Sequence, residues 1–388
     1  MERLASIISA ALLASAACAV PAAAADRVSP FPEITRLKGP EETTVWRIEP
    51  AVLRADTVAS LDPVQIWADE ITRQVPAILG DTDRSRAAYD RIMEALFEWA
   101  GAEALTSVQG ETTRALLPRR VIGGVTAYLA VKPIADATND IRKPAIERWI
   151  HDQARFARAI YGGEAMPGME GTPLNYRNNL QATAATLAME TYLITGDASL
   201  RDWAMTATRA VLDEIDAAGF TSEIRRTNPQ AAEYFGHETM IFVVATAKMA
   251  ADNGDASLWT YRGAGAGAAT DPAILRAGAL LGADLGGNYV TKRHAVKTGL
   301  PQNPYRKSYI VTAGADGLLL PEGWLTCWID PFLAQYGDAA AQPGLQRLRV
   351  ASDYYRLKKI SQFNGSVPLR PAMTASAPLA KVPAAQFE

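Results

Sequence analysis

The chain has 388 residues, of which 48% are hydrophobic and 21% are charged. That length and apolar content are enough to bury a large core, which excludes disorder as the main state. The formal net charge of −3 gives no overall basic field. Nucleic acid is therefore not expected as a partner, and an anionic ligand would have to be met by local cations.

The first 25 residues have the pattern of a secretory signal peptide. Arg3 precedes an apolar run, and small residues lead up to Asp26. The run is too short for a good membrane span, so we expect no span and a periplasmic protein. Cys18 matches a lipoprotein box poorly because the usual leucine is missing, and a lipid anchor is the weaker alternative. Without Cys18, Cys327 is the only cysteine, and we predict that it is buried and not catalytic.

Helical periodicity dominates the rest of the chain. Short breaks that combine Gly with Asp or Thr separate the periodic stretches, so successive helices should run antiparallel. No strand ladder is evident. We predict an all-α fold, an (α/α) toroid domain over 26–365, followed by a Pro- and Ala-rich tail, 366–388. The stretches with apolar residues at i, i+3, i+4 and i+7 are 65–79, 84–100, 113–132, 141–161, 180–195, 199–217, 234–252 and 273–285.

Two polar segments carry most of the candidate chemistry. The first is 174–180, with the sequence Leu-Asn-Tyr-Arg-Asn-Asn-Leu, and the second is 223–238, which contains two arginines, Tyr234 and His237. Together they supply amides, guanidiniums, a phenol and an imidazole. Such groups can neutralise a carboxylate and move a proton beside it, which is what β-elimination at a uronic acid requires.

Several segments resemble, in order and spacing, the bacterial periplasmic alginate lyases. The resemblance covers roughly residues 45–340. It implies an incomplete (α/α) toroid with a central cleft, and a lyase that breaks a 4-linked uronate polysaccharide without a metal. The segments that carry it are Trp99-Ala-Gly-Ala-Glu-Ala-Leu105, 119–132, Ile146-Glu-Arg-Trp149, Asn178-Asn179, Asp216-Ala-Ala-Gly-Phe220 and 324–336.

The catalytic motifs of that family are altered in this chain. The family keeps Asn-Asn-His, and here Leu180 occupies the His position. The family also keeps Arg-x-x-x-Tyr-His-Asn-Tyr, and here Gln230 aligns with the Arg, Tyr234 with the first Tyr and His237 with the catalytic Tyr. The family mechanism therefore does not carry over intact. Two alternatives stay open: reassigned catalytic groups acting on another uronate, or a homologue that has kept the cleft and lost the chemistry.

Four residues are predicted to be catalytic. Asn178 and Arg226 would neutralise the uronate carboxylate. His237 would be the base, and Tyr234, three positions earlier and so on the same helical face, would protonate the leaving oxygen. The alternatives are that Asn178 only caps a helix, that Arg226 is a solvated surface residue, and that His237 and Tyr234 pack in the core.

A second group of residues is predicted to bind substrate. Among them His294 lies in a basic stretch, 289–294, that we expect to be a loop. The three histidines of the chain show no metal-ligand spacing, and we predict no metal and no cofactor. The predicted substrate-binding residues are Tyr176, Asn179, Arg225, Gln230, Arg119, Arg120, Arg293 and His294.

Three functions fit these observations. The first is a polysaccharide lyase that cleaves a uronate-containing exopolysaccharide by metal-independent β-elimination. The second is a glycoside hydrolase that uses carboxylates of Glu223, Glu233 or Glu238. The third is a non-catalytic homologue that binds polysaccharide during export. In each case the expected partner is an anionic polysaccharide, and we expect a monomer.

Overall fold

The structure is a computed structural model that describes most of the chain between residues 61 and 299. The signal peptide predicted for 1–25, with Cys18, and the tail predicted for 366–388 lie outside the described residues. The described residues are 27–31, 37–39, 54–55, 61–80, 82–162, 166, 171–226, 229–285, 290–299, 310–313, 318–321, 325, 327–337 and 348.

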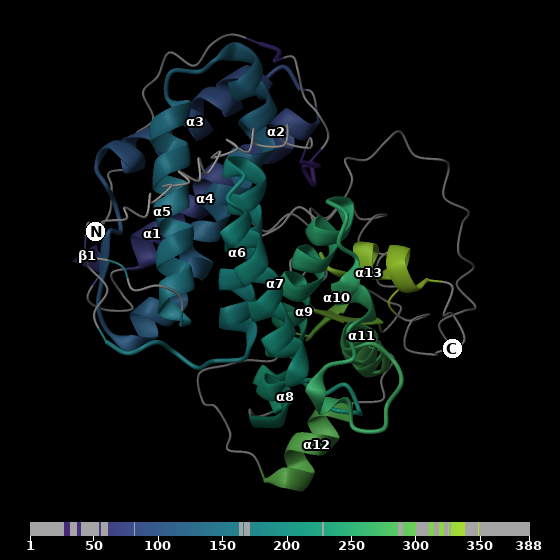
Figure 1. The fold of residues 1–388 in the computed structure, drawn as a ribbon. Helices are drawn as coiled ribbons and strands as arrows, with labels where there is room; N and C mark the ends of the chain where they lie inside the picture. Colours follow the sequence, from purple (N-terminus) through teal and green to yellow (C-terminus); the bar gives the residue numbers. More distant parts are fainter. Residues whose placement is uncertain are drawn as a thin grey trace, which may run out of the picture.

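The described residues are mostly helical, which confirms the predicted all-α class (Figure 1). The helices are α1 (Asp62–Thr72), α2 (Val75–Leu79), α3 (Ser85–Gly101), α4 (Glu111–Thr138), α5 (Lys143–Ile160), α6 (Asn179–Thr195), α7 (Ala198–Asp213), α8 (Ser222–Arg226), α9 (Pro229–Asp252), α10 (Ser257–Thr260), η2 (Ala264–Ala266), α11 (Ala273–Ala283), α12 (Val290–Thr298) and α13 (Ile329–Tyr336). The strands are β1 (Arg54–Ala55), β2 (Ser107–Val108), β3 (Ile310–Ala313) and β4 (Leu318–Pro321).

The differences from the predicted elements have local causes. The stretch 65–79 is two helices, and the second, α2, has Pro76 in its first turn, where a missing N–H costs nothing. For the same reason α9 begins at Pro229, before the predicted start at Tyr234. The expected loop around His294 is wrong, because these residues form α12. The strands were not predicted; β1 pairs with β2 in parallel and β3 with β4 antiparallel, over spans too short to show alternation.

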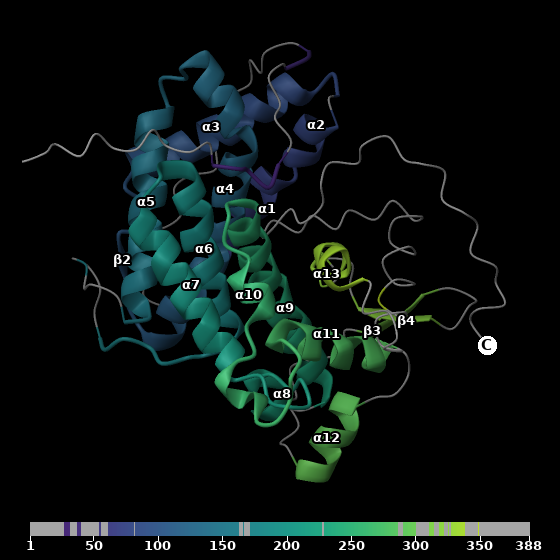
Figure 2. The ribbon, with the colours of Figure 1, turned by 45° about the vertical axis from the view of Figure 1, so that its right-hand side comes forward.

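Helix α6 lies at the centre of the packing. It contacts α4 and α9 along one layer, and α5 and α7 along a second layer. Figures 1 and 2 show this arrangement, with α8 and α12 together at the end of the molecule where α6 begins. Because α4, α6 and α9 are neighbours, polar residues near their starts can be brought into one site. No helix among the described residues has the length and apolar character that a membrane crossing needs.

A cluster of tryptophans fixes the N-terminal half of the core. The rings of Trp67 and Trp99 stack with centroids 4.1 Å apart. The ring of Trp149 meets both edge-on, at 5.9 Å and 6.4 Å. Its indole N–H donates to the carbonyl of Ala104 at 2.8 Å, so the buried polar atom is satisfied. The cluster joins α1, α3 and α5, and α4 packs against it through Gly124.

Substituting alanine for Gly124 should destabilise the protein by about 1–3 kcal/mol, because the new methyl group overfills this cluster. A Cβ at Gly124 would lie 2.6 Å from the nearest ring carbon of Trp67. The measurement is urea unfolding at pH 7. Gly101→Ala is the matched control, since a Cβ there meets no atom within 4 Å and alanine favours a helix. Equal stability for the two variants would contradict the expectation.

Candidate functional site

The site lies at the start of α6, where Asn178 precedes the first helical residue, Asn179. Asn178 is the N-cap of the helix, and its side-chain oxygen accepts the backbone N–H of Leu180 at 3.0 Å. Its amide nitrogen donates to the carboxylate of Glu223 at 2.8 Å. The capping role and the site role, which the sequence left as alternatives, therefore coexist: the oxygen caps the helix while the nitrogen faces a carboxylate.

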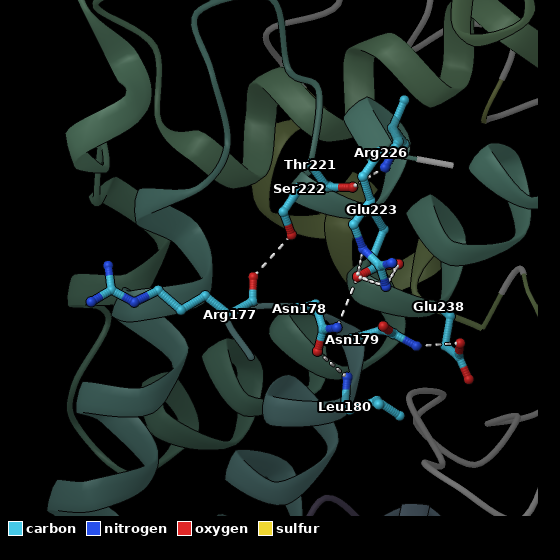
Figure 3. A network of polar contacts seen from close by, with 10 residues as sticks. Arg177, Asn178, Asn179, Leu180, Thr221, Ser222, Glu223, Arg226 and Glu238 are labelled. Carbon is cyan, nitrogen blue, oxygen red and sulfur yellow. Dashed lines mark hydrogen bonds and ion pairs between the residues drawn. The ribbon is translucent and has the colours of Figure 1, made fainter. Parts of the chain in front are cut away.

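Glu223 lies on the short helix α8 and is only 1% exposed. Its carboxylate accepts hydrogen bonds from Arg226, which lies one helical turn later. Nε and Nη2 of Arg226 donate to Oε1 at 2.9 and 2.7 Å. Nη2 also reaches Oε2 at 2.7 Å. The helix is joined to the segment before α6 by a second bond, in which the hydroxyl of Ser222 donates to the carbonyl of Arg177 at 3.0 Å. These contacts are drawn in Figure 3.

Asn179 forms a second arrangement of the same kind. Its amide nitrogen donates at 2.7 Å to Oε2 of Glu238, which lies on α9 and is 1% exposed. The other oxygen of Glu238 is 2.8 Å from Nη2 of Arg119 on α4. Each asparagine is thus tied to a buried glutamate, as Figure 3 shows, and each glutamate contacts an arginine. The second arrangement joins the inner helices α4, α6 and α9.

An open pocket of about 750 Å³ lies beside the first asparagine. Its walls come from the segment before α6, from the end of α7 and from α8. Two guanidiniums and two carboxylates line it, so it has both charges rather than a single basic field. The lining residues are Asn175, Tyr176, Arg177, Asn178, Leu180, Glu214, Ser222, Glu223 and Arg226.

Glu214 and Tyr176 at the pocket wall are each held by contacts with other side chains. Glu214 is 3.2 Å from Nη2 of Arg225 and 3.7 Å from Nη1 of Arg177. The phenol of Tyr176 donates to the carboxylate of Glu111, and this hydrogen bond raises the pKa of Tyr176. At neutral pH the phenol therefore keeps its proton. Its single proton is engaged by Glu111, so the phenol can donate to a ligand only in exchange for that bond, and it is not a base.

His237 is placed in the core rather than in the pocket. It is 2% exposed, and its Nδ1 accepts the indole N–H of Trp328 at 3.1 Å. Burial lowers its pKa to about 3. Because the indole can only donate, the proton of the neutral ring sits on Nε2, and neither ring nitrogen offers a lone pair. This geometry argues against the predicted role as base and matches the alternative of a packed core histidine.

The remaining predicted residues are distributed around this centre. Arg225 faces Glu214 and Arg120 donates to Gln65 on α1 at 2.8 Å, so Arg120 serves helix packing. His294 stacks on Phe220 with centroids 4.6 Å apart, on α12, and Arg293 beside it is exposed. Tyr234 and Gln230 belong to α9, but their side chains lie outside the described residues.

The buried glutamates were not predicted as partners of the asparagines. From the sequence, Glu223 and Glu238 were interpreted only as the catalytic carboxylates of a glycoside hydrolase. The one local signal was the spacing of Glu223 and Arg226, three apart on a helix, which suits an ion pair. Nothing local links Glu238 to Asn179. Among the described residues, no group of three or more His, Cys, Asp or Glu side chains is placed to hold a metal ion.

Cys327 is buried, as predicted. Burial raises the pKa of its thiol to about 12, so the thiolate that a nucleophile needs is absent at neutral pH. His151 lies on α5, and its Nε2 is 2.9 Å from the carboxylate of Asp197, the N-cap of α7, so this contact links two helices away from the pocket.

The site lies in the part of the chain that matches a known protein family. Residues 117–274 match the alginate lyase family, and they include Arg119, both asparagines, Glu223 and Glu238. No curated protein sequence matches the chain significantly.

Two solved structures share the fold. A histidine-to-alanine variant of alginate lyase A1-III complexed with a tetrasaccharide has a TM-score of 0.55 at 15% identity, covering 78% of this chain and 82% of that chain. A tyrosine-to-phenylalanine variant of the same lyase, also complexed with a tetrasaccharide, has a TM-score of 0.53 at 15% identity, covering 82% and 81%.

The family match covers residues 117–274, and the fold is that of these two solved lyase structures, an incomplete (α/α) toroid. The resemblance to alginate lyases that the sequence suggested is confirmed.

Proposed function

We propose that the protein cleaves a 4-linked, uronic-acid-containing exopolysaccharide by metal-independent β-elimination, and that the pocket at the start of α6 binds the uronate carboxylate. The observation that carries the proposal is the convergence of Asn178, Arg177, Arg226 and Tyr176 on one pocket inside the segment that matches the alginate lyase family. These are hydrogen-bond donors of the kind that a carboxylate and sugar hydroxyls accept.

β-Elimination requires that the negative charge of the uronate carboxylate is neutralised. Removal of the C5 proton places negative charge next to a group that is already anionic, and donors on the carboxylate stabilise the enolate-like transition state. The loss of one such donor typically costs about 3 kcal/mol in barrier. Arg226 is suited to this task because its side chain is 63% exposed, while its Nε and Nη2 are anchored on Glu223.

We assign the proton transfer to Tyr234, which as a phenolate would take the C5 proton and pass it to the leaving O4 oxygen as the C4–O4 bond breaks. This residue is retained at the position of the first tyrosine of the family motif and lies in the first turns of α9. His237, one turn later, has its ring in the core, and we assign it a packing role. Tyr176, which keeps its proton at the pocket wall, would donate to the substrate by exchanging its hydrogen bond with Glu111.

We further propose that the protein works in the periplasm, released from the signal peptide expected in residues 1–25. Its substrate there would be an exopolysaccharide in transit through this compartment. An anionic polymer fits the local arginines of the pocket, although the chain as a whole has a net charge of −3.

The activity is tested by incubating the purified protein with glucuronan, alginate and native exopolysaccharides, with and without EDTA. We expect ultraviolet absorbance from an unsaturated uronate to rise with at least one polymer, and EDTA to leave the rate unchanged. Tyr234→Phe should abolish the absorbance change while polymer binding persists. Product release without a double bond would contradict elimination and indicate hydrolysis.

A second candidate function, polysaccharide binding without cleavage, is favoured by two observations. Leu180 stands where the family has its histidine, and His237 is withdrawn into the core. In that case the protein would bind a uronate polymer, no absorbance would appear with any substrate, and Tyr234→Phe would change nothing. A hydrolase is favoured less, because Glu223 and Glu238 each already hold an amide and a guanidinium.

A further inference from the structure

Glu223 occupies an unusual place for a charged residue. Its side chain is only 1% exposed at the wall of the pocket, and it contacts two other lining groups that come from different elements. Asn178 approaches it from the start of α6, and Arg226 approaches it from its own helix, α8. A buried carboxylate is costly unless it is paired and hydrogen-bonded, and here both conditions are met.

The contact fixes the orientation of Asn178. Its oxygen caps the N–H of Leu180 at 3.0 Å while its nitrogen donates to Glu223 at 2.8 Å. Because the carboxylate accepts only and the backbone N–H donates only, rotating the amide by half a turn would break both bonds. Asn178 therefore presents one defined donor arrangement to the pocket.

The contact also fixes the guanidinium of Arg226. Nε and Nη2 are both engaged with Glu223, which leaves Nη1 as the nitrogen with no hydrogen bond to the described residues. The side chain is largely exposed, and without an anchor it would occupy many rotamers. An anchored guanidinium loses less conformational freedom when a ligand arrives.

We propose that Glu223 is the positioning residue of this pocket: it holds Asn178 and Arg226 so that their remaining N–H groups meet a uronate carboxylate. The inference rests on the proposed function for the identity of the ligand. Glu223 acts through these two side chains and does not touch the substrate. Its negative charge weakens the general attraction for anions, so the pocket would recognise a carboxylate by directed hydrogen bonds.

The test uses the full-length mature protein and a glucuronic acid oligosaccharide as the probe, with affinity measured by calorimetry at low salt. Glu223→Gln should weaken binding about tenfold, and Arg226→Leu at least as much. In the double variant, Glu223→Gln should cost less than it does alone, because only its effect through Asn178 remains when Arg226 is absent. A purely structural role would weaken binding in both backgrounds alike.

Glu214→Gln is the matched control. It removes the same charge from the same pocket but leaves Asn178 and Arg226 untouched, since Glu214 pairs with Arg225 and Arg177. Binding should become tighter, because one negative charge leaves the pocket wall and Arg177 is released toward the ligand. If Glu223→Gln also tightens binding, the carboxylate merely competes with the ligand and the positioning role is overturned.

A crystal structure of the Glu223→Gln variant gives a readout that needs no ligand. We expect Arg226 and the amide of Asn178 to be displaced, and finding both in place would overturn the proposal. If the Gln variant does not fold, Glu223→Asp serves for the same measurements, because it keeps the charge and shortens its reach. Wild-type affinity in Arg226→Leu, with displacement in the variant crystal, would instead contradict the proposed ligand pocket and leave the positioning role supported.

Discussion

Replacing Arg119 by leucine should lower the free energy of unfolding by about 3 kcal/mol, one of the two largest effects that we expect from a single change. Nη2 of Arg119 lies 2.8 Å from the carboxylate of Glu238, which is 1% exposed. Removing one partner of a buried ion pair leaves an uncompensated charge in a region of low polarity. Urea unfolding at pH 7 measures the loss.

The neighbouring arginine provides the control. Arg120 donates to the neutral amide of Gln65, so Arg120→Leu should cost on the order of 1 kcal/mol. Adding Glu238→Gln to Arg119→Leu should restore much of the lost stability, because the buried charge is then removed as well. Equal losses for the two leucine variants, or no recovery in the double variant, would show that Glu238 is not a buried charge held by Arg119.

The second large effect is a loss of stability in mild acid that is caused by His237. Its pKa is about 3 in the folded protein, against an ordinary value of 6.5. Between these values the unfolded chain binds a proton that the folded protein rejects, so stability is fully present above pH 6.5 and declines as the pH falls. A single such group contributes about 1.4 kcal/mol per pH unit, or roughly 2.5 kcal/mol between pH 6.5 and 4.5.

The measurement compares the wild type with His237→Phe by urea unfolding at pH 7.0, 5.5 and 4.5. Their difference should shrink as the pH falls. Burial raises the pKa of Glu190, a buried carboxyl that accepts from Thr126. The stabilisation that Glu190 contributes is present below its ordinary pKa and is lost as the pH rises through its raised pKa. Because both proteins contain Glu190, this effect cancels when their stabilities are compared. A constant difference would contradict the burial of a neutral imidazole.

The same variant decides between the two roles of His237. If the residue only packs, His237→Phe should keep much of any lyase activity at a temperature where it is folded. A loss of more than about 100-fold in kcat, with unchanged KM and intact fold, would restore the imidazole as the base. His294→Phe is a useful comparison, because that ring is partly exposed on α12 and stacks on Phe220.

The helical framework could be predicted because its signals are local. Apolar spacing defined the stretches that became α3, α5, α6 and α9, and the Asn pair marked the start of α6 correctly. The segment of α12 was misjudged as a loop, since its sequence carries several charges and little apolar periodicity. Such a short helix is stabilised by its contacts with α8 and α9, which lie outside the reach of a sequence window.

The site could be predicted only in part. Asn178 and Arg226, to which the residue types and the family pattern pointed, line one pocket, and their catalytic roles stay predictions. The direction in which His237 faces could not be predicted, since α9 is apolar on several sides and the spacing from Tyr234 does not distinguish core from pocket. The pairing of Asn179 with Glu238 depends on how α6 docks on α9, which only the tertiary structure determines.

The ion pair of Arg119 and Glu238 also has a consequence for folding kinetics. The two residues are 119 positions apart (238 − 119) and belong to α4 and α9, with α6 between them. Closing so long a loop is entropically expensive, so contacts of this kind form after local helical pairs during folding. The second Asn–Glu–Arg arrangement therefore comes into existence only when three separate helices have docked. A partly folded chain would lack it.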